Sequence, residues 1–201
     1  MPAARKRELT VPDLVLLSLL AEQPMHGYQA NLELERRQVQ DWAGLSRPQV
    51  YYSLEKLERR KLIHEDGDQK PALGPERRIF STTAKGREAL AAALEREDWS
   101  NQRERPPFLT WMALSWQAGP GVFQKQLQRR EKFLETELAR EIEALRAVEN
   151  EVGHRFHEAA WMISLMIEQF RTELRWLRKV AGELDRRAPA MHPSHVGKDV
   201  R

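Results

Sequence analysis

Side chains of the types that contact DNA are concentrated in Ser46–Ile63, SRPQVYYSLEKLERRKLI. Val50, Leu54 and Leu57 fall at i, i+4 and i+7, which predicts a helix with one buried stripe. The other face carries cationic, hydrogen-bonding and aromatic groups, which are suited to phosphates and base edges. These residues are Arg47, Gln49, Tyr52, Ser53, Lys56, Arg59 and Arg60. The helix therefore predicts a nucleic-acid partner.

A capping box marks the beginning of this helix. Ser46 supplies the N-cap and Gln49 follows three residues later. In helix-turn-helix proteins the first part of the recognition helix enters the major groove, so Arg47, Gln49 and Lys56 are the strongest candidates for DNA contact. Tyr51 borders the apolar stripe, and the sequence leaves open whether it contacts DNA or packs on the core.

Two further helices are expected before this one. The first begins after Thr10 and ends near Pro24, and the second opens at Met25 and ends around residues 38–41. Asp41–Leu45 is the expected turn between the second and third helices. Short helices joined by short turns, the third of them polar, predict a helix-turn-helix core.

A wing is expected after the third helix. Leu62–Glu65 and Arg77–Thr82 predict two short strands, and the turn-rich Asp66–Glu76 predicts the loop between them. Thr83–Glu97 predicts one more helix. The residues of the wing expected to contact DNA phosphates are Lys70, Arg77 and Arg78.

Three strings in this order, LSLLAEQPMHGYQ, SRPQVYYSLEKLERRKLI and RRIFSTTAKGREAL, resemble the winged-helix domain of the PadR family of transcriptional regulators. The resemblance covers about residues 9–95 and implies a DNA-binding domain. It places the family's tyrosine of the third helix at Tyr51, its Gly-Tyr pair at Gly27-Tyr28, and its basic wing residues at Arg77 and Arg78.

The chain departs from the family pattern in three places. Lys61 stands where a glycine is usual, Gly74-Pro75 where Gly-Arg is common, and Thr82-Thr83 where Leu-Thr is common. The arginine missing at Pro75 affects the expected contact between the wing and DNA, but not the expected fold. The full set expected to bind DNA is Ser46, Arg47, Gln49, Tyr51, Tyr52, Lys56, Lys70, Arg77 and Arg78.

A second, all-helical domain is expected after a polar linker at 98–107. Phe108–Gln117 predicts an apolar helix and Val122–Val152 a long charged one. From Phe156 to Leu184 apolar residues recur at alternating spacings of four and three, which predicts a helical seam. The simplest arrangement is an antiparallel hairpin. The expected division is residues 1–97 winged helix-turn-helix, 98–107 linker, 108–187 helical dimerisation and effector domain, and 188–201 disordered tail.

The stretch Ala159–Ile167 is apolar on nearly every face, so it must be covered from several sides. Either the Phe108–Gln117 helix or a second subunit can cover it, and both are expected, which predicts a homodimer. A two-fold dimer presents two recognition helices to half-sites about one DNA turn apart. The helical half also resembles that of the larger PadR-like regulators, notably in FRTELRWLRKVAGEL, up to about residue 185.

Large aromatic and methionine side chains are numerous in the helical half. They either fill the core and the dimer interface or line a cavity for an effector. The family resemblance implies the second role, because some PadR-like regulators respond to aromatic or phenolic acids. The residues expected at such a site are Trp111, Trp116 and Trp161, with His157, Arg171 or Arg175 for a carboxylate.

Other functions have little support in the sequence. The 201 residues include no cysteine, which excludes disulfides and thiolate sites. His154 and His157 lack a third metal ligand nearby, and neither a glycine-rich phosphate loop nor a nucleophile motif is present. We expect no enzyme activity, cofactor or metal, and no membrane span or secretory signal, so a cytoplasmic location is expected.

The sequence thus predicts a mainly α protein, with an N-terminal winged helix-turn-helix of three helices and a β-hairpin wing, followed by a helical hairpin. The expected function is that of a homodimeric DNA-binding transcriptional repressor, released by a small aromatic effector. The net charge of +3 is too small to favour nucleic acid by itself. The alternative is a winged-helix scaffold that binds proteins without specific DNA binding.

Overall fold

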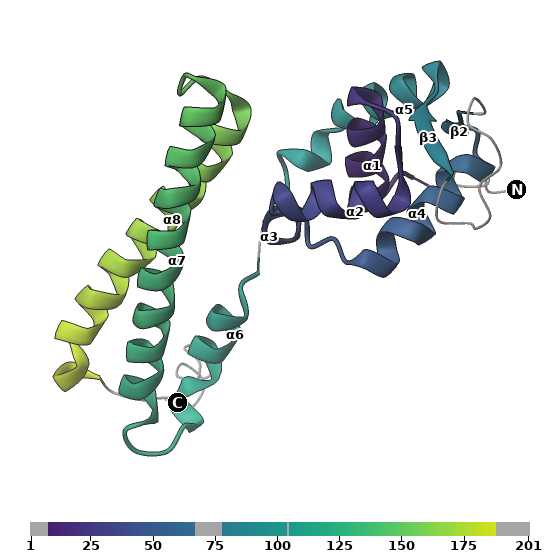
Figure 1. Ribbon diagram of the computed structural model, residues 1–201. Helices are drawn as coiled ribbons and strands as arrows, with labels where there is room; N and C mark the ends of the chain where they lie inside the picture. The colour runs from purple at the N-terminus through teal and green to yellow at the C-terminus, as the bar shows by residue number, and fades with distance from the viewer. Residues whose placement is uncertain (1–7, 67–77, 104, 188–201) are drawn as a thin grey trace, which may run out of the picture. The chain divides into compact units, whose positions relative to one another are not determined.

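The computed structural model describes residues 8–66, 78–103 and 105–187, and the chain divides into two units between Arg103 and Glu104. Lys70 and Arg77 of the predicted wing lie outside the described residues, as does the predicted tail. Figure 1 shows the elements of both units.

The first unit is a set of helices with a small sheet (Figure 1). Its elements are α1 (Val11–Glu22), β1 (Met25–His26), α2 (Gly27–Arg36), α3 (Val39–Ala43), α4 (Arg47–Arg59), β2 (Ile63–Glu65), β3 (Ile79–Thr82), α5 (Ala84–Leu94) and the 3₁₀ turn η2 (Glu97–Trp99). This is the predicted winged helix-turn-helix, with α4 as its third long helix.

The sheet has three antiparallel strands in the order β1-β3-β2. Met25 lies opposite Phe80, and Ile63 lies opposite Thr82. Two of these strands, β2 and β3, were predicted from the sequence. The prediction that Met25 belongs to the second helix is wrong, because Met25 lies in β1. His26 is the N-cap of that helix, because its Nδ1 accepts a hydrogen bond from the Gln29 backbone at 3.1 Å.

The second helix is also shorter than the pattern predicts. α2 ends at Arg36, and Gln38 then adopts a left-handed backbone conformation that starts the separate short helix α3. Gly44 ends α3 in the same left-handed region, at φ 62°, where glycine is favoured. Part of the predicted turn at 41–45 is therefore helical, and the turn before α4 is only residues 44–46.

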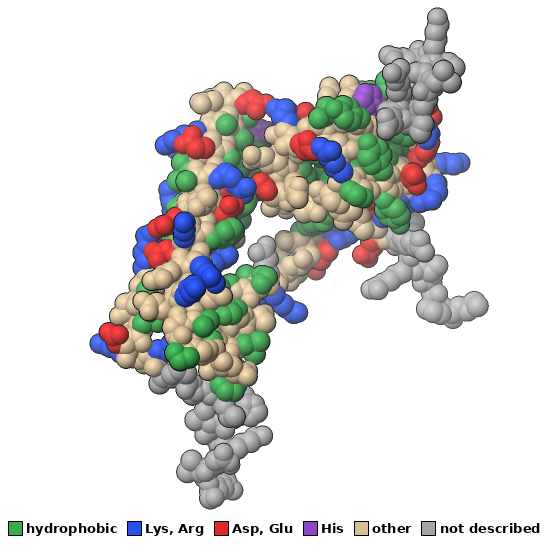
Figure 2. All heavy atoms as spheres, turned by 60° about the horizontal axis from the view of Figure 1, so that its bottom comes forward, with side chains coloured by type: hydrophobic (Ala, Val, Ile, Leu, Met, Phe, Trp, Pro, Cys, Tyr) green, Lys and Arg blue, Asp and Glu red, His purple; other side chains and the backbone are tan. Residues whose placement is uncertain are grey.

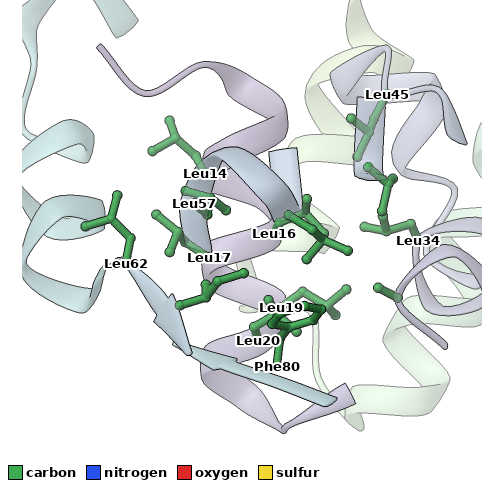
Figure 3. Packing of buried hydrophobic residues seen from close by; sticks show 14 of the residues in the cluster. Leu14, Leu16, Leu17, Leu19, Leu20, Leu34, Leu45, Leu57, Leu62 and Phe80 are labelled. Atoms are coloured by element: carbon green, nitrogen blue, oxygen red, sulfur yellow. The ribbon is translucent and has the colours of Figure 1, made fainter. Parts of the chain in front are cut away.

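The core of the first unit forms around α1, which contacts α4, α5 and β3. Leu16 and Leu17 of α1 and Leu57 of α4 are fully buried. Figure 3 shows these leucines pointing inward together with Phe80 of β3. Each fully buried leucine contributes about 1.5–3 kcal/mol of hydrophobic stabilisation. The buried stripe of α4 thus fixes which of its faces is left for a partner.

The second unit is the predicted helical hairpin. Its elements are α6 (Pro107–Leu114), the 3₁₀ turn η3 (Ser115–Gln117), α7 (Val122–Val152), α8 (Glu158–Gly182) and the 3₁₀ turn η4 (Leu184–Arg186). α7 and α8 lie side by side (Figure 1). Gly121 and Gly153, with φ 74° and 80°, bound α7 at the two ends that the sequence predicts. No helix within the described ranges is long and apolar enough to cross a membrane.

Most of the predicted seam of α8 faces α7. Ala160, Ile163, Ile167, Leu174 and Leu177 are buried. Two positions of the predicted pattern are wrong, because Phe156, which precedes α8, and Ala181, in its last turn, are exposed. Leu184, the last residue of the pattern, packs against the cluster of Leu174 and Leu177.

The apolar segment at the beginning of α8 is only partly covered by the residues that the structure describes. α6 packs at the other end of the hairpin, where Phe108 and Met112 contact a cluster that includes Leu174 and Leu177. Trp161 and Leu165 are left 56% and 61% exposed. The expectation that the Phe108–Gln117 helix covers this segment is therefore wrong.

Candidate nucleic-acid interface

The first turn of α4 is held by the predicted capping box. Ser46 is the N-cap, and its backbone N–H and its hydroxyl both donate to Gln49 Oε1 at 2.8 Å. Both residues are exposed. The Gln49 oxygen is thus used to begin the helix.

Two tyrosines stand on the outer side of α4. Tyr52 is 61% exposed and Tyr51 is 43% exposed. The Tyr51 ring packs over Gly27 at the start of α2, where a Cβ on Gly27 would come within 3.0 Å of Tyr51 Cε1. Tyr51 therefore combines the two roles that the sequence left open: one side of its ring packs on α2, and the rest is accessible to a partner.

Arg47 is the most exposed cation at the start of α4, with 70% of its side chain accessible. Its Nε donates to Glu35 Oε1 of α2 at 2.8 Å, and its Nη2 donates to the same oxygen. This hydrogen bond with Glu35 raises the pKa of the Arg47 guanidinium. Both residues line a pocket of about 400 Å³ between α2, α3 and α4.

Lys56 does not lie on the accessible face of α4, where the sequence predicted it. Its Nζ donates to Asp13 Oδ2 at 2.5 Å, and only 16% of the Lys56 side chain is exposed. Asp13 is fully buried. The placement of Lys56 on the accessible face of the helix is therefore wrong, because its ammonium compensates a buried carboxylate of α1. Ser53, also assigned to the polar face, is buried as well.

Arg78 is the one predicted wing cation within the described residues. Its Nε donates to Glu65 Oε2 at 2.8 Å, while Nη1 and Nη2 both donate to Glu58 of α4. These carboxylates raise its pKa, and the guanidinium lies over the Phe80 ring at 4.9 Å. Arg78 thus ties β3 to β2 and α4.

Sequence reasoning missed the acidic partners of all these cations. None of Asp13, Glu35 and Glu58 was predicted to pair with a cation. The capping box of Thr10 with Asp13 could have indicated a carboxylate at the start of α1. No sequence signal links Glu35 to Arg47, because the contact depends on how α2 and α4 pack.

The six residues predicted for an effector site do not line one cavity. Trp111 lies in α6 and lines a groove of about 300 Å³ with Phe108 and Arg130. Arg171 and Arg175 line a separate groove of about 340 Å³ between α7 and α8.

The other three predicted effector residues are elsewhere. Trp116 is in η3, and His157 is the N-cap of α8, where its Nδ1 accepts from the Ala159 backbone at 3.1 Å. Trp161 and Leu177 are separated by about 24 Å along α8 at 1.5 Å per residue, so Trp161 is remote from the end on which α6 packs. Among the described residues, no group of three or more histidine, aspartate or glutamate side chains could hold a metal ion.

Figure 2 shows one face of the molecule, on which the hairpin is the limb at the left. Lys and Arg side chains alternate there with Asp and Glu side chains, and hydrophobic side chains show between them. This face of the hairpin therefore shows no continuous basic surface.

Comparisons with known proteins cover both units. Residues 16–92 match the model of the transcriptional regulator PadR-like family. No curated protein matches the chain. The crystal structure of Bacillus subtilis PadR in complex with operator DNA is 15% identical, with a TM-score of 0.72 over 87% of this chain and 99% of that one.

Two further crystal structures share the fold. The PadR-like transcriptional regulator BC1756 from Bacillus cereus is 19% identical, with a TM-score of 0.66 over 87% of this chain and 98% of its own. Bacillus subtilis PadR in complex with p-coumaric acid is 15% identical, with a TM-score of 0.57 over 87% and 96%. At such low identities these likenesses show the fold alone.

The family match runs from α1 to α5 and so includes α4, the sheet and the three cations Arg47, Lys56 and Arg78. The family consists of transcriptional regulators and not of enzymes. The match over residues 16–92 therefore places the first unit of the chain in the PadR-like family of transcriptional regulators.

Proposed function

We propose that this protein represses transcription by binding a two-fold operator as a homodimer, with α4 of each subunit in a major groove. The observation that carries the proposal is the beginning of α4. Arg47, Tyr51 and Tyr52 are exposed there, on a helix whose opposite face is anchored in the core. The first turns of a recognition helix contact base edges in helix-turn-helix proteins. Because the proposed partner is DNA, we expect the protein to act in the cytoplasm.

The positions of the side chains change the set of residues that we propose to contact DNA, compared with the set predicted from the sequence. Arg47, Tyr51 and Tyr52 remain in it, with Ser46 and Gln49 beside them at the start of the helix. Lys70 and Arg77 stay predictions from the sequence. We leave out Lys56, whose side chain is only 16% exposed, and Arg78, whose Nε, Nη1 and Nη2 all donate to carboxylates of the same domain.

A homodimer through α8 is supported by an apolar face that the described part of the chain leaves exposed. Trp161, Leu165 and Trp176 are exposed and fall on one side of α8, since their spacings of 4 and 11 residues are close to whole helical turns. Exposed apolar patches of this kind mark protein interfaces. A second copy of α8 supplies a matching apolar face across a two-fold axis.

Release by a small aromatic acid is the finer part of the proposal. One relative of this chain is known in complex with p-coumaric acid. The groove of Trp111 offers aromatic faces with Arg129 beside them, which suits an aromatic carboxylate. Arg130 also lines this groove, but its Nε and Nη2 donate to Glu173 at 2.8 and 2.9 Å. If this groove is the site, p-coumaric acid releases the wild type from DNA and does not release Trp111→Ala. Trp116→Ala, outside the groove, is the control. Unchanged release of Trp111→Ala would reject this site.

The class of function is tested by titrating the protein against its own upstream DNA and a scrambled duplex at several salt concentrations. We expect binding to the upstream duplex roughly 10³-fold tighter or more. We also expect the logarithm of the binding constant to fall linearly with the logarithm of salt concentration, because phosphate contacts release counterions.

A second candidate is the protein-binding scaffold. The observation favouring it is that three cations of the DNA domain, Arg47, Lys56 and Arg78, all have carboxylate partners. In that case both duplexes bind equally weakly at every salt concentration.

A further inference from the structure

The guanidinium of Arg47 is used on one edge only. A guanidinium has a side edge, formed by Nε and Nη2, and an end edge, formed by Nη1 and Nη2. Glu35 Oε1 accepts from Nε at 2.8 Å and from Nη2, so the carboxylate occupies the side edge. No residue in the described part of the chain accepts from Nη1. The end edge of Arg47 is therefore open, and its direction is set by Glu35.

Two other arginines of the same domain, Arg37 and Arg78, donate from their end edges to carboxylates within the protein. The end edge of Arg37 is bonded to both carboxylate oxygens of Glu22 at 2.8 and 2.6 Å, and its Nε is bonded to Glu33. Arg78 likewise gives its end edge to Glu58 and its Nε to Glu65. These two arginines are fully engaged within the protein. Arg47, at the first position of α4, keeps its forked end free.

An arginine end edge has a specific partner in DNA. Guanine presents N7 and O6 side by side in the major groove, and two parallel N–H donors fit this pair of acceptors. A lysine ammonium attracts phosphates equally well but lacks the planar fork. A long exposed arginine normally loses rotamer freedom when it binds, and a carboxylate that already holds its side edge reduces that loss.

We propose that Glu35 is a specificity-determining residue: it orients Arg47 so that the end edge of the guanidinium reads one guanine in each half-site. Glu35 itself does not touch this guanine; it is a positioning residue. The inference rests on the proposed function, since it requires sequence-specific DNA binding through α4. Beyond the proposed function, the inference names the base that Arg47 reads, a guanine, and gives Glu35 of α2 a role in DNA recognition.

The test uses the full-length protein and a set of duplexes derived from the tightest-binding sequence, each with one base pair of the half-site replaced. Wild type should prefer guanine at one position by roughly 5-fold to 150-fold, the usual range for a bidentate contact. Arg47→Lys should lose this preference while binding at other positions stays selective. Glu35→Gln, which keeps size and removes charge, should reduce the same preference at least about 5-fold without weakening binding to a scrambled duplex.

Glu33→Gln is the matched control, because Glu33 lies on the same helix and pairs with Arg36 and Arg37 instead of Arg47. It should leave the preference for guanine unchanged. Circular dichroism melting establishes that each variant is folded.

Two outcomes contradict the inference in distinguishable ways. If Glu35→Gln keeps the full guanine preference that Arg47→Lys loses, Arg47 reads the base and Glu35 has no part in it. If Arg47→Lys also keeps that preference, neither residue reads the base, although the protein binds DNA specifically. A wild type that prefers no base at any position rejects the proposed function itself, and the inference with it.

Discussion

Lys56 Nζ donates a hydrogen bond to Asp13 Oδ2 across 2.5 Å and so joins α4 to the start of α1. The same Asp13 oxygen accepts from the backbone N–H and the hydroxyl of Thr10, at 2.7 and 2.8 Å. One buried carboxylate oxygen therefore caps α1 and anchors the helix proposed to read DNA. This contact connects the stability of the domain to the position of α4.

We expect Lys56→Met to lower the free energy of unfolding by about 3–5 kcal/mol, because it leaves the buried Asp13 carboxylate without its cation. Urea denaturation followed by circular dichroism measures the loss. Arg59→Met on the exposed side of the same helix is the control, with an expected change within about 0.5 kcal/mol. Equal effects of the two substitutions would show that the ion pair contributes nothing.

Stability should also depend on pH through Asp13. Burial by itself raises the pKa of Asp13, but the hydrogen bonds from Lys56 and Thr10 outweigh it and lower the pKa below its usual value of 3.8. A carboxyl with a lowered pKa in the folded state stabilises the fold above its unfolded pKa, and this stability is lost as the pH falls through the folded pKa.

Wild type should therefore exceed Asp13→Asn in free energy of unfolding at neutral pH, and the difference should shrink as the pH falls below about 4. Urea denaturation at a series of pH values measures both proteins. Glu33, whose pKa is lowered to about 2 chiefly by the hydrogen bond from Arg36, titrates in both and cancels in the comparison. A difference that stays constant down to low pH contradicts the assignment.

Gly86 of α5 is required by close packing on the backbone of Leu62. A Cβ at this position would lie 2.1 Å from the Leu62 carbonyl oxygen, and neither backbone can move without displacing α5 or β2. We expect Gly86→Ala to destabilise the first unit by about 1–3 kcal/mol or more, measured by thermal melting. Gly182→Ala in α8 meets nothing within 4 Å and should leave stability unchanged or slightly raised. An unchanged melting temperature for Gly86→Ala would contradict this packing.

Leu165→Glu should convert the proposed dimer into a monomer, because it places a charge on the uncovered apolar face of α8. Sedimentation analysis gives the mass in solution. Leu94→Glu in α5 is the matched control, since Leu94 and Leu165 are both 61% exposed and only one lies on α8. If the dimer persists with Leu165→Glu, its interface lies elsewhere, and a monomeric wild type would remove the dimer altogether.

Sequence patterns predicted those features that depend on neighbouring residues. The bounds of α7 follow from its flanking glycines, and Ser46 with Gln49 marks the start of α4, because helix ends are set by local backbone requirements. The β1 strand was missed because its two residues pair with β3, more than 50 residues away.

The candidate site was predicted only in part for the same reason. Lys56 has the right spacing for the polar face of a helix, but its partner Asp13 lies 43 residues earlier in the chain. Whether a lysine near the edge of a helix face is exposed or paired depends on the helix packed beside it. The exposure of Tyr52 and Arg47 followed from helical periodicity alone, whereas the contact of Arg47 with Glu35 did not.

In the proposed complex, two copies of α4 enter two major grooves of one operator. Methylation interference tests it directly, because a methyl group on guanine N7 blocks a side chain in the major groove. With the tightest-binding duplex, we predict interference at guanines in two symmetric groups whose centres are about 10 base pairs, or a multiple of one helical turn, apart. Arg47→Ala should lose one guanine from each group. Interference at no guanine, or at a single unrepeated group of guanines, would contradict this placement of α4.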